Sequence, residues 1–355
     1  MLPKMKIGKL VFEPIIQGGM GAGVSLAPLA SAVSALGGLG TVAGAGIDRL
    51  VSERIGRKVN SREAAAIEIS EAKKCGKPIA INVMVALVDS YNEVVLGALD
   101  GGVDVIISGA GPPLMLPSVV ASHQRGKEVA LIPIVSSGRF LRLLCKRWER
   151  MGHIPDAVVV EGPLAGGHLG WRKIEEIENP DNALEKILPE CVEVAKEFGG
   201  FPIIAAGGID CKEEIARFLS LGAAGVQIAT RFLATKESSA SEDYKQAVLK
   251  CKKEDIIVTM MSPCGLPFRT LKNCPMYEGV ASGRHKTVCN KGYVLLRGKC
   301  LAKSDGKHFF CLCNGLFSSA GYSYEGTPPL YTVGAKAYLI DKISTTEEVM
   351  NELTN

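Results

Sequence analysis

The stretch Ala157-Val-Val-Val-Glu161-Gly-Pro-Leu-Ala-Gly-Gly-His168-Leu-Gly170 places a short apolar run directly before a glycine-rich loop. A β-branched run followed by glycines is typical of a buried strand that ends at a sheet edge, where backbone amides can approach a ligand. The loop carries one imidazole, His168. An isolated histidine more often satisfies a turn, but this position after a buried strand predicts that His168 faces a bound molecule.

Similar apolar runs recur along the chain, with helix-like segments between them. Eight runs qualify as strands, namely 14–16, 39–43, 79–83, 103–107, 131–135, 157–160, 202–206 and 225–228. Helical patterns fill intervals such as 61–74, 182–198 and 213–221. This alternation indicates parallel βαβ units of an α/β protein, and eight units fit a closed (β/α)8 TIM barrel. A doubly wound open sheet is the alternative, but it needs no eighth unit.

Composition points to an ordinary folded protein that acts on small molecules. The 355 residues are 47% hydrophobic and 22% charged, with a net charge of +4 and no basic block. Aromatic residues make up only 6%. The charge and the scarcity of stacking rings argue against a nucleic-acid partner.

No charged side chain lies between Glu13 and Asp48, which raises the question of a membrane span. Glycines, two prolines and several serines interrupt this stretch, and it lacks the pattern of a signal peptide. We therefore expect buried strands and a helix here, no membrane partner and a cytoplasmic location.

Polar and glycine-rich clusters follow the strand runs, so a barrel would bring them to one face. The loops after the last two strands carry Gly207, Gly208 and Thr230. In such barrels these two loops commonly hold a phosphate through exposed N–H groups. Tight turns before helices are the simpler explanation of each glycine alone, but the pair of loops in this order predicts a phosphate site.

Four motifs in order resemble the nitronate monooxygenase family, formerly called 2-nitropropane dioxygenases, whose barrel is shared by flavin-dependent enoyl-acyl-carrier-protein reductases. They are 14–21 (PIIQGGMG), 165–170 (AGGHLG), 206–209 (AGGI) and 227–232 (QIATRF), and the similarity covers about residues 7–270. The resemblance implies a non-covalently bound FMN at the carboxyl end of the barrel. It assigns to the cofactor site Gln17, Gly18, Gly19, Met20, Asn82, Ser136, Glu161, Gly166, Gly167, Gly207, Gly208, Gln227, Ala229 and Thr230. We assign no residue to a metal site.

One position departs from the family pattern, because Ala229 stands where glycine is usual before Thr-Arg-Phe. A methyl group fits there if the residue keeps a negative φ. The resemblance gives His168 the role of active-site base or substrate-orienting donor beside the flavin, and an ordinary imidazole pKa of about 6.5 suits proton transfer near neutral pH.

Two reactions are compatible with these motifs. In the first, which we favour, the enzyme oxidises alkyl nitronates or nitroalkanes with O2 to a carbonyl compound and nitrite. In the second, NAD(P)H reduces FMN and an enoyl thioester is then reduced. The sequence leaves open the physiological substrate, the use of NAD(P)H and whether the chain forms a homodimer. A flavin-binding redox sensor and a flavin-free phosphate-binding barrel are weaker alternatives.

The regular pattern stops after the eighth unit. We expect an FMN-binding barrel over 1–261, a Cys-rich insertion or subdomain near the barrel mouth over 262–330, and a helical region over 331–355. The middle segment holds Cys264, Cys274, Cys289, Cys300, Cys311 and Cys313, with no Cys-x-x-Cys pair. Reduced, mostly buried thiols are the favoured interpretation, and a zinc or iron–sulfur site is the alternative.

Overall fold

A computed structural model describes residues 2–288, 300–322 and 326–355. Eight parallel strands form its central sheet, in the order β3-β11-β10-β8-β7-β6-β5-β4. Each predicted strand is present, with its ends within two residues of those expected. The strands are β3 Ile15–Gln17, β4 Gly40–Ala43, β5 Ile79–Met84, β6 Val105–Gly109, β7 Ala130–Val135, β8 Val158–Glu161, β10 Ile203–Ala206 and β11 Gly225–Ile228.

The sheet closes on itself between its first and last strands. A parallel bridge joins Ile16 to Leu39 just before β4. The Gln17 amide donates to the Leu39 carbonyl and the Leu39 amide to the Ile15 carbonyl, both at 2.9 Å. These bonds confirm the (β/α)8 barrel and rule out the open doubly wound sheet, whose edge strands would not meet.

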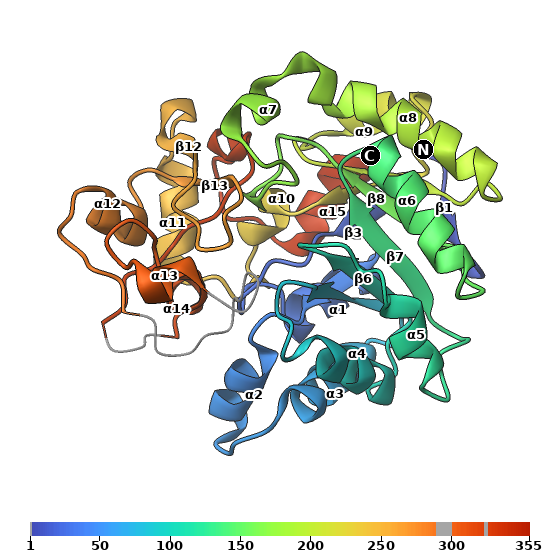
Figure 1. The fold of residues 1–355 in the computed structure, drawn as a ribbon, viewed down its shortest axis with the longest axis horizontal. Coiled ribbons are helices and arrows are strands. Elements are labelled where there is room, and N and C mark those ends of the chain that lie inside the picture. Colours follow the sequence, from blue (N-terminus) through green and yellow to red (C-terminus); the bar gives the residue numbers. More distant parts are fainter. Residues whose placement is uncertain (1, 289–299, 323–325) are drawn as a thin grey trace.

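Helices surround the barrel (Figure 1). The three helices expected from the sequence are confirmed as α3, α8 and α9, again to within two residues. Asn60 begins α3 as a side-chain cap, and Ser137 does the same for α6, because their oxygens accept the amides of the first turn. The helices of the barrel are α1 Ala27–Ala35, α2 Ile47–Ile55, α3 Ser61–Lys73, α4 Tyr91–Asp100, α5 Leu116–Ala121, α6 Gly138–Glu149, α8 Leu184–Glu197, α9 Lys212–Ser220 and α10 Thr230–Leu233.

The uncharged stretch after Glu13 forms β3, α1 and β4, as expected of buried elements. Helix α1 lies directly against β4, because a Cβ atom placed on Gly40 would come within 1.8 Å of the Ala30 carbonyl oxygen. Among the described helices, none combines the length and apolar character needed to cross a bilayer.

A short antiparallel hairpin covers the amino-terminal end of the barrel. It consists of β1 Met5–Ile7 and β2 Leu10–Phe12. Its buried residues Ile7 and Phe12 belong to the same hydrophobic cluster as Ile107 and Val159 of the central strands. The hairpin therefore completes the barrel core at the end opposite the predicted site.

The chain after the barrel folds into short elements, shown in yellow to red in Figure 1. Strands β12 and β13 form a small sheet with β9, which is the loop strand that carries His168. This sheet places the post-barrel segment at the carboxyl end of the barrel. The remaining elements are β9 Gly167–His168, α7 Ile174–Glu178, α11 Glu242–Lys250, β12 Ile256–Thr259, β13 Phe268–Leu271, α12 Pro275–Ala281, α13 Leu301–Ser304, α14 Leu312–Ser319, α15 Thr346–Thr354 and the 3-10 turns η1 Pro180–Asn182, η2 Lys253–Asp255 and η3 Ala337–Leu339.

Candidate active site

A cavity of about 830 Å³ lies at the carboxyl ends of the barrel strands. The loops after the strands supply its walls, as a TIM barrel requires. Every predicted site residue except Gln17 lines it, namely Gly18, Gly19, Met20, Asn82, Ser136, Glu161, Gly166, Gly167, His168, Gly207, Gly208, Gln227, Ala229 and Thr230.

Gln17 lies behind the first loop and is fully buried. Its amide nitrogen donates to the Ser25 hydroxyl at 2.9 Å and to the Gly18 carbonyl, and its oxygen accepts the Thr41 amide at 3.0 Å. These bonds tie β3 to β4 and hold the start of the loop. The structure thus gives Gln17 a supporting position rather than a place in the cavity wall.

The His168 loop is fixed by residues from beyond the barrel. Strand β13 pairs with β9, so that Phe268 lies opposite His168 and Arg269 opposite Gly167. The Leu169 amide donates to the Pro267 carbonyl at 3.0 Å. Sheet pairing therefore sets the direction in which the imidazole points.

The Arg269 guanidinium is buried behind the same loop. It donates to the Pro163 carbonyl at 2.7 Å and to the Ala165 carbonyl. Burial lowers the pKa of Arg269 to about 10. The two loop carbonyls are thereby held by one buried cation, which also contributes positive charge beside the cavity.

The His168 ring has a polar and an apolar neighbour. A hydrogen bond of 2.7 Å joins its Nε2 to the hydroxyl of Ser262, and its ring meets Phe268 edge to face at 4.8 Å between centroids. Burial lowers the pKa of His168 to about 4. This pKa lies well below the ordinary value expected from the sequence, so the imidazole is neutral at pH 7 and is a weak base.

Two further polar side chains enter the cavity from neighbouring strand ends. Glu161 and Gln227 both pair in register with Ala206, so their side chains flank it on the same face. Burial raises the pKa of Glu161 to about 7. The side-chain oxygen Oε1 of Gln227 is buried without a hydrogen-bond partner among the described residues. An unsatisfied buried acceptor of this kind points to a ligand that donates hydrogen bonds.

Glycines let the backbone close in on the cavity at several points. Gly207 and Gly208 have φ of 98° and 79°, which favour glycine. A Cβ atom on Gly19 would come within 2.5 Å of the Asn82 Cβ. Ala229 keeps a negative φ of −116°, so its methyl group meets the condition set by the sequence.

The C-terminal segment crosses the end of the cavity where the phosphate is expected. The Gly334 amide donates to the Thr230 hydroxyl at 3.0 Å. Two residues later, the Lys336 ammonium contacts the Asp210 carboxylate at 3.1 Å and the Glu214 carboxylate. Gly334 and Lys336 both line the cavity, although neither was predicted.

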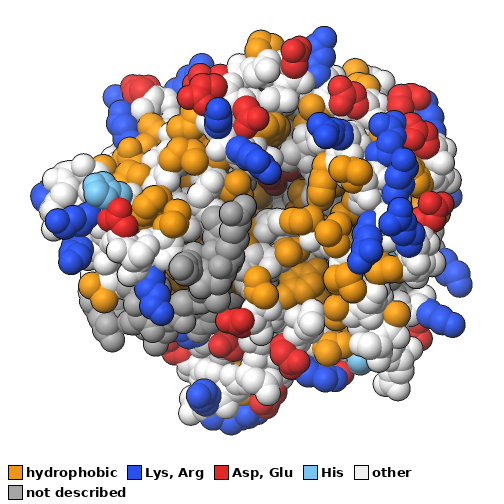
Figure 2. All heavy atoms as spheres, in the orientation of Figure 1, with side chains coloured by type: hydrophobic (Ala, Val, Ile, Leu, Met, Phe, Trp, Pro, Cys, Tyr) orange, Lys and Arg blue, Asp and Glu red, His pale blue; other side chains and the backbone are white. Residues whose placement is uncertain are grey.

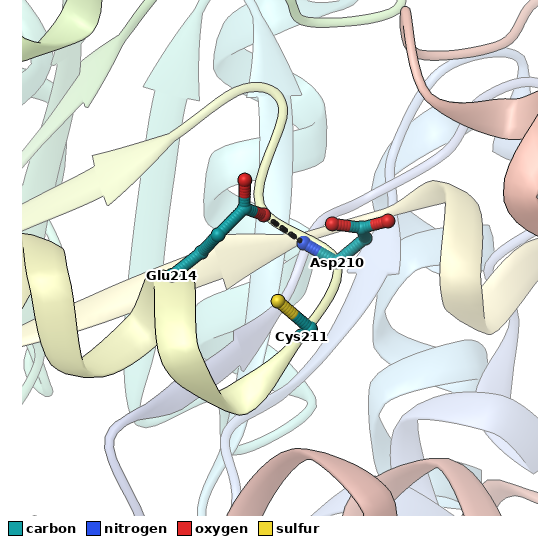
Figure 3. A group of neighbouring side chains, drawn as sticks. All are labelled: Asp210, Cys211 and Glu214. Carbon is teal, nitrogen blue, oxygen red and sulfur yellow. Dashed lines mark hydrogen bonds between the residues drawn. The ribbon is translucent and has the colours of Figure 1, made fainter.

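Asp210, Cys211 and Glu214 gather at the start of α9, where the Asp210 amide donates to the Glu214 carboxylate at 3.0 Å (Figure 3). Their potential ligand atoms lie within 4.8 Å of one another. Lys336 already bridges the two carboxylates. This cluster is therefore an ion pair with a helix cap, and the geometry assigns it no metal.

Most cysteines of the post-barrel segment that the structure describes are buried, namely Cys264, Cys274, Cys300 and Cys311. Burial raises the pKa of the Cys264 thiol to about 12. Over residues 2–288, 300–322 and 326–355, the sole group of three potential metal ligands is the one at Asp210. Cys289 lies outside the described residues.

Three side chains of this site escaped the sequence analysis: Ser262, Arg269 and Lys336. Ser262 stands 94 residues from the histidine that it contacts. Its local sequence, Ser262-Pro-Cys-Gly-Leu-Pro267, gives no sign of this contact. A buried arginine and an ion-paired lysine carry no local pattern that separates them from surface residues.

The profile of the nitronate monooxygenase family matches residues 3–355. The chain belongs to the nitronate monooxygenase family.

Two curated proteins are similar to this chain and carry different names. The chain is 30% identical over 271 residues to a Mycobacterium tuberculosis protein named (3aS,4S,5R,7aS)-5-hydroxy-7a-methyl-1-oxo-octahydro-1H-indene-4-carboxyl-CoA dehydrogenase, covering 76% of this chain and 66% of that protein. It is 34% identical over 128 residues to a probable nitronate monooxygenase of Staphylococcus aureus strain JH9, covering 35% of each. Both alignments span less than two thirds of the relative's length.

Solved structures extend the similarity over nearly the whole chain. The structure of FabK from Thermotoga maritima superposes with a TM-score of 0.68 at 26% identity, covering 96% of this chain and 91% of that one. Nitroalkane oxidase from Streptomyces ansochromogenes gives a TM-score of 0.67 at 23% identity, with 98% and 96% coverage, and shares the fold.

Proposed function

We propose that this chain is an FMN-dependent oxidoreductase that oxidises alkyl nitronates with O2 to a carbonyl compound and nitrite. The observation that carries the proposal is the cavity itself, in which glycine-lined loops, an unsatisfied Gln227 acceptor and a neutral His168 meet. Family membership supports the same chemistry.

The residues present fit FMN. Gln227 Oε1 lacks a donor that the ribityl hydroxyls would provide. The amides around Gly207 and Gly208, with Thr230 and Lys336, suit a phosphate, while Gly18, Gly19 and Met20 would border the ring. When bound, FMN supplies the electron acceptor and the reaction with O2. The protein supplies position, shielding from water and hydrogen bonds.

The lowered pKa of His168 favours a substrate that arrives as the anion. An imidazole with a pKa of about 4 accepts a proton from a neutral nitroalkane poorly. As a neutral ring it offers one N–H donor, and its contact with Ser262 fixes its orientation. We therefore assign His168 to orienting and stabilising the nitronate, with the buried charge of Arg269 favouring an anion nearby.

The decisive test follows oxygen uptake. Purified protein is expected to carry a flavin and to consume O2 with propyl-2-nitronate in the absence of NADH. For His168→Ala we expect retained flavin and turnover reduced by about 100-fold or more, the usual contribution of a positioned acid–base or orienting group. The matched control is His153→Ala, which replaces a histidine that does not line the cavity. Equal loss in both variants would remove His168 from the mechanism.

The second candidate is reduction of an enoyl thioester with NAD(P)H. Its support is the similarity to the carboxyl-CoA dehydrogenase of Mycobacterium tuberculosis, whose name specifies a thioester. An anaerobic titration with NADH separates the two functions. Rapid bleaching of the flavin and turnover of crotonyl thioester, without nitronate-driven O2 uptake, would replace the first function with this one.

A further inference from the structure

Helix α14 of the Cys-rich segment reaches the cavity. Leu312 and Leu316 line it, one helical turn apart. The next residue, Phe317, is 1% exposed and packs in the core, whereas Leu316 remains partly exposed. The helix is thus anchored by one set of side chains and presents another to the cavity.

Other partly exposed apolar side chains line the same cavity, two from the barrel and one from the post-barrel segment. Ala45 follows β4 and Met84 ends β5, while Leu266 precedes β13. Met84, Ala45 and Leu316 pack against one hydrophobic cluster, which also contains Phe268. The cavity therefore has an apolar arm, defined here as Ala45, Met84, Leu266, Leu312 and Leu316.

Another part of the cavity wall is polar and contains Asp210, Thr230, Arg231 and Lys336. His168 lines the same cavity and contacts Phe268 of the arm's cluster. A face view shows hydrophobic side chains gathered on both sides of a central hollow (Figure 2). Apolar side chains left partly open beside a reaction site gain stability when a hydrocarbon covers them.

We propose that the apolar arm binds the hydrocarbon chain of the substrate, so that the enzyme prefers long-chain nitronates over short ones. This inference takes the nitronate group of the substrate from the proposed function. Binding of the chain in the arm needs only a ligand with an anionic head and an alkyl chain. The segment that contributes α14 lies outside the barrel, and it thereby sets the specificity of a site whose chemistry the barrel provides.

Unreactive carboxylates test the arm, because a carboxylate resembles the planar anionic head of a nitronate. Straight-chain carboxylates from propanoate to decanoate are titrated into the protein as purified, by calorimetry. We expect Kd to fall about fourfold for each added methylene until the arm is full. For Leu316→Trp the fall should stop at a shorter chain. Met84→Trp, which narrows the arm from β5, should act in the same direction.

Leu143→Trp is the matched control, since Leu143 is 59% exposed on α6 and does not line the cavity. It should leave the chain-length series unchanged. A Kd that varies less than twofold across the series would overturn the inference, as would a series in both arm variants identical to that of the control. Flavin content and nitronate-driven O2 uptake are measured separately, so failure of the proposed function is distinguished from failure of the arm.

Discussion

At the scale of single residues, burial has moved two pKa values in the cavity in opposite senses. The pKa of Glu161 rises to about 7 and that of His168 falls to about 4, in both cases because burial disfavours the charged form. Near neutral pH the cavity wall therefore holds a neutral imidazole and a carboxyl group that is partly protonated. An anionic substrate is better accommodated by a protonated Glu161 than by an ionised one, because the ionised carboxylate would repel it.

The raised pKa of Glu161 predicts a specific pH dependence of stability. The folded state keeps a proton on Glu161 between the ordinary pKa of 4.5 and about 7, so stability from this group is lost as pH rises through that window. Flavin-free Glu161→Gln should match the parent at pH 4 and exceed it at pH 8 by at most about 3 kcal/mol. Urea unfolding at both pH values measures this, with the exposed Glu149→Gln as control. An equal difference at both pH values would contradict it.

At the scale of elements, the β9–β13 pairing and Arg269 hold the His168 loop together. Arg269→Met removes the donors of two carbonyls but also a costly buried charge, and we expect a net loss of about 1–3 kcal/mol. Amide hydrogen exchange in 163–169 should accelerate, while exchange in β5 stays unchanged. Arg269→Lys keeps a hydrogen-bond donor, so its stability and its exchange rates should lie between those of the parent and of Arg269→Met. Unaltered exchange in 163–169 in the Met variant would show that pairing alone fixes the loop.

The elements also show what sequence could and could not predict. Strand ends and the cavity glycines were predictable because hydrophobic period and backbone freedom are local properties. The contacts of Ser262 and Lys336 join parts of the chain far apart in sequence, where no local pattern specifies partners. Gln17 illustrates the same limit. Its motif placed it near the ligand, but only the fold shows that its side chain lies behind the cavity wall and binds the backbone of β4.

At the scale of the whole molecule, Lys336 ties the C-terminal segment to α9 through Asp210 and Glu214. Lys336→Met would leave two neighbouring carboxylates without their cation. Burial, with the contact to Asp210, already raises the pKa of Glu214.

We therefore expect Lys336→Met to lose about 1–3 kcal/mol at pH 8 and less at pH 4, where protonation relieves the repulsion. Denaturant unfolding at the two pH values measures the difference. Lys342→Met, which breaks the more exposed pair with Glu352, should cost less than about 1 kcal/mol. Equal losses of stability in the two variants would mean that the bridge from Lys336 to α9 contributes no more than an exposed ion pair.

The bond between His168 and Ser262 has a consequence for biosynthesis. A ribosome completes all eight barrel strands before it reaches residue 262, so a nascent chain passes through a stage with a full barrel and an unsupported imidazole. Only continued translation through β13 gives the loop its pairing partner. Products of premature termination near residue 250 should thus be inert even where they fold, and the enzyme acquires its chemistry late in its own synthesis.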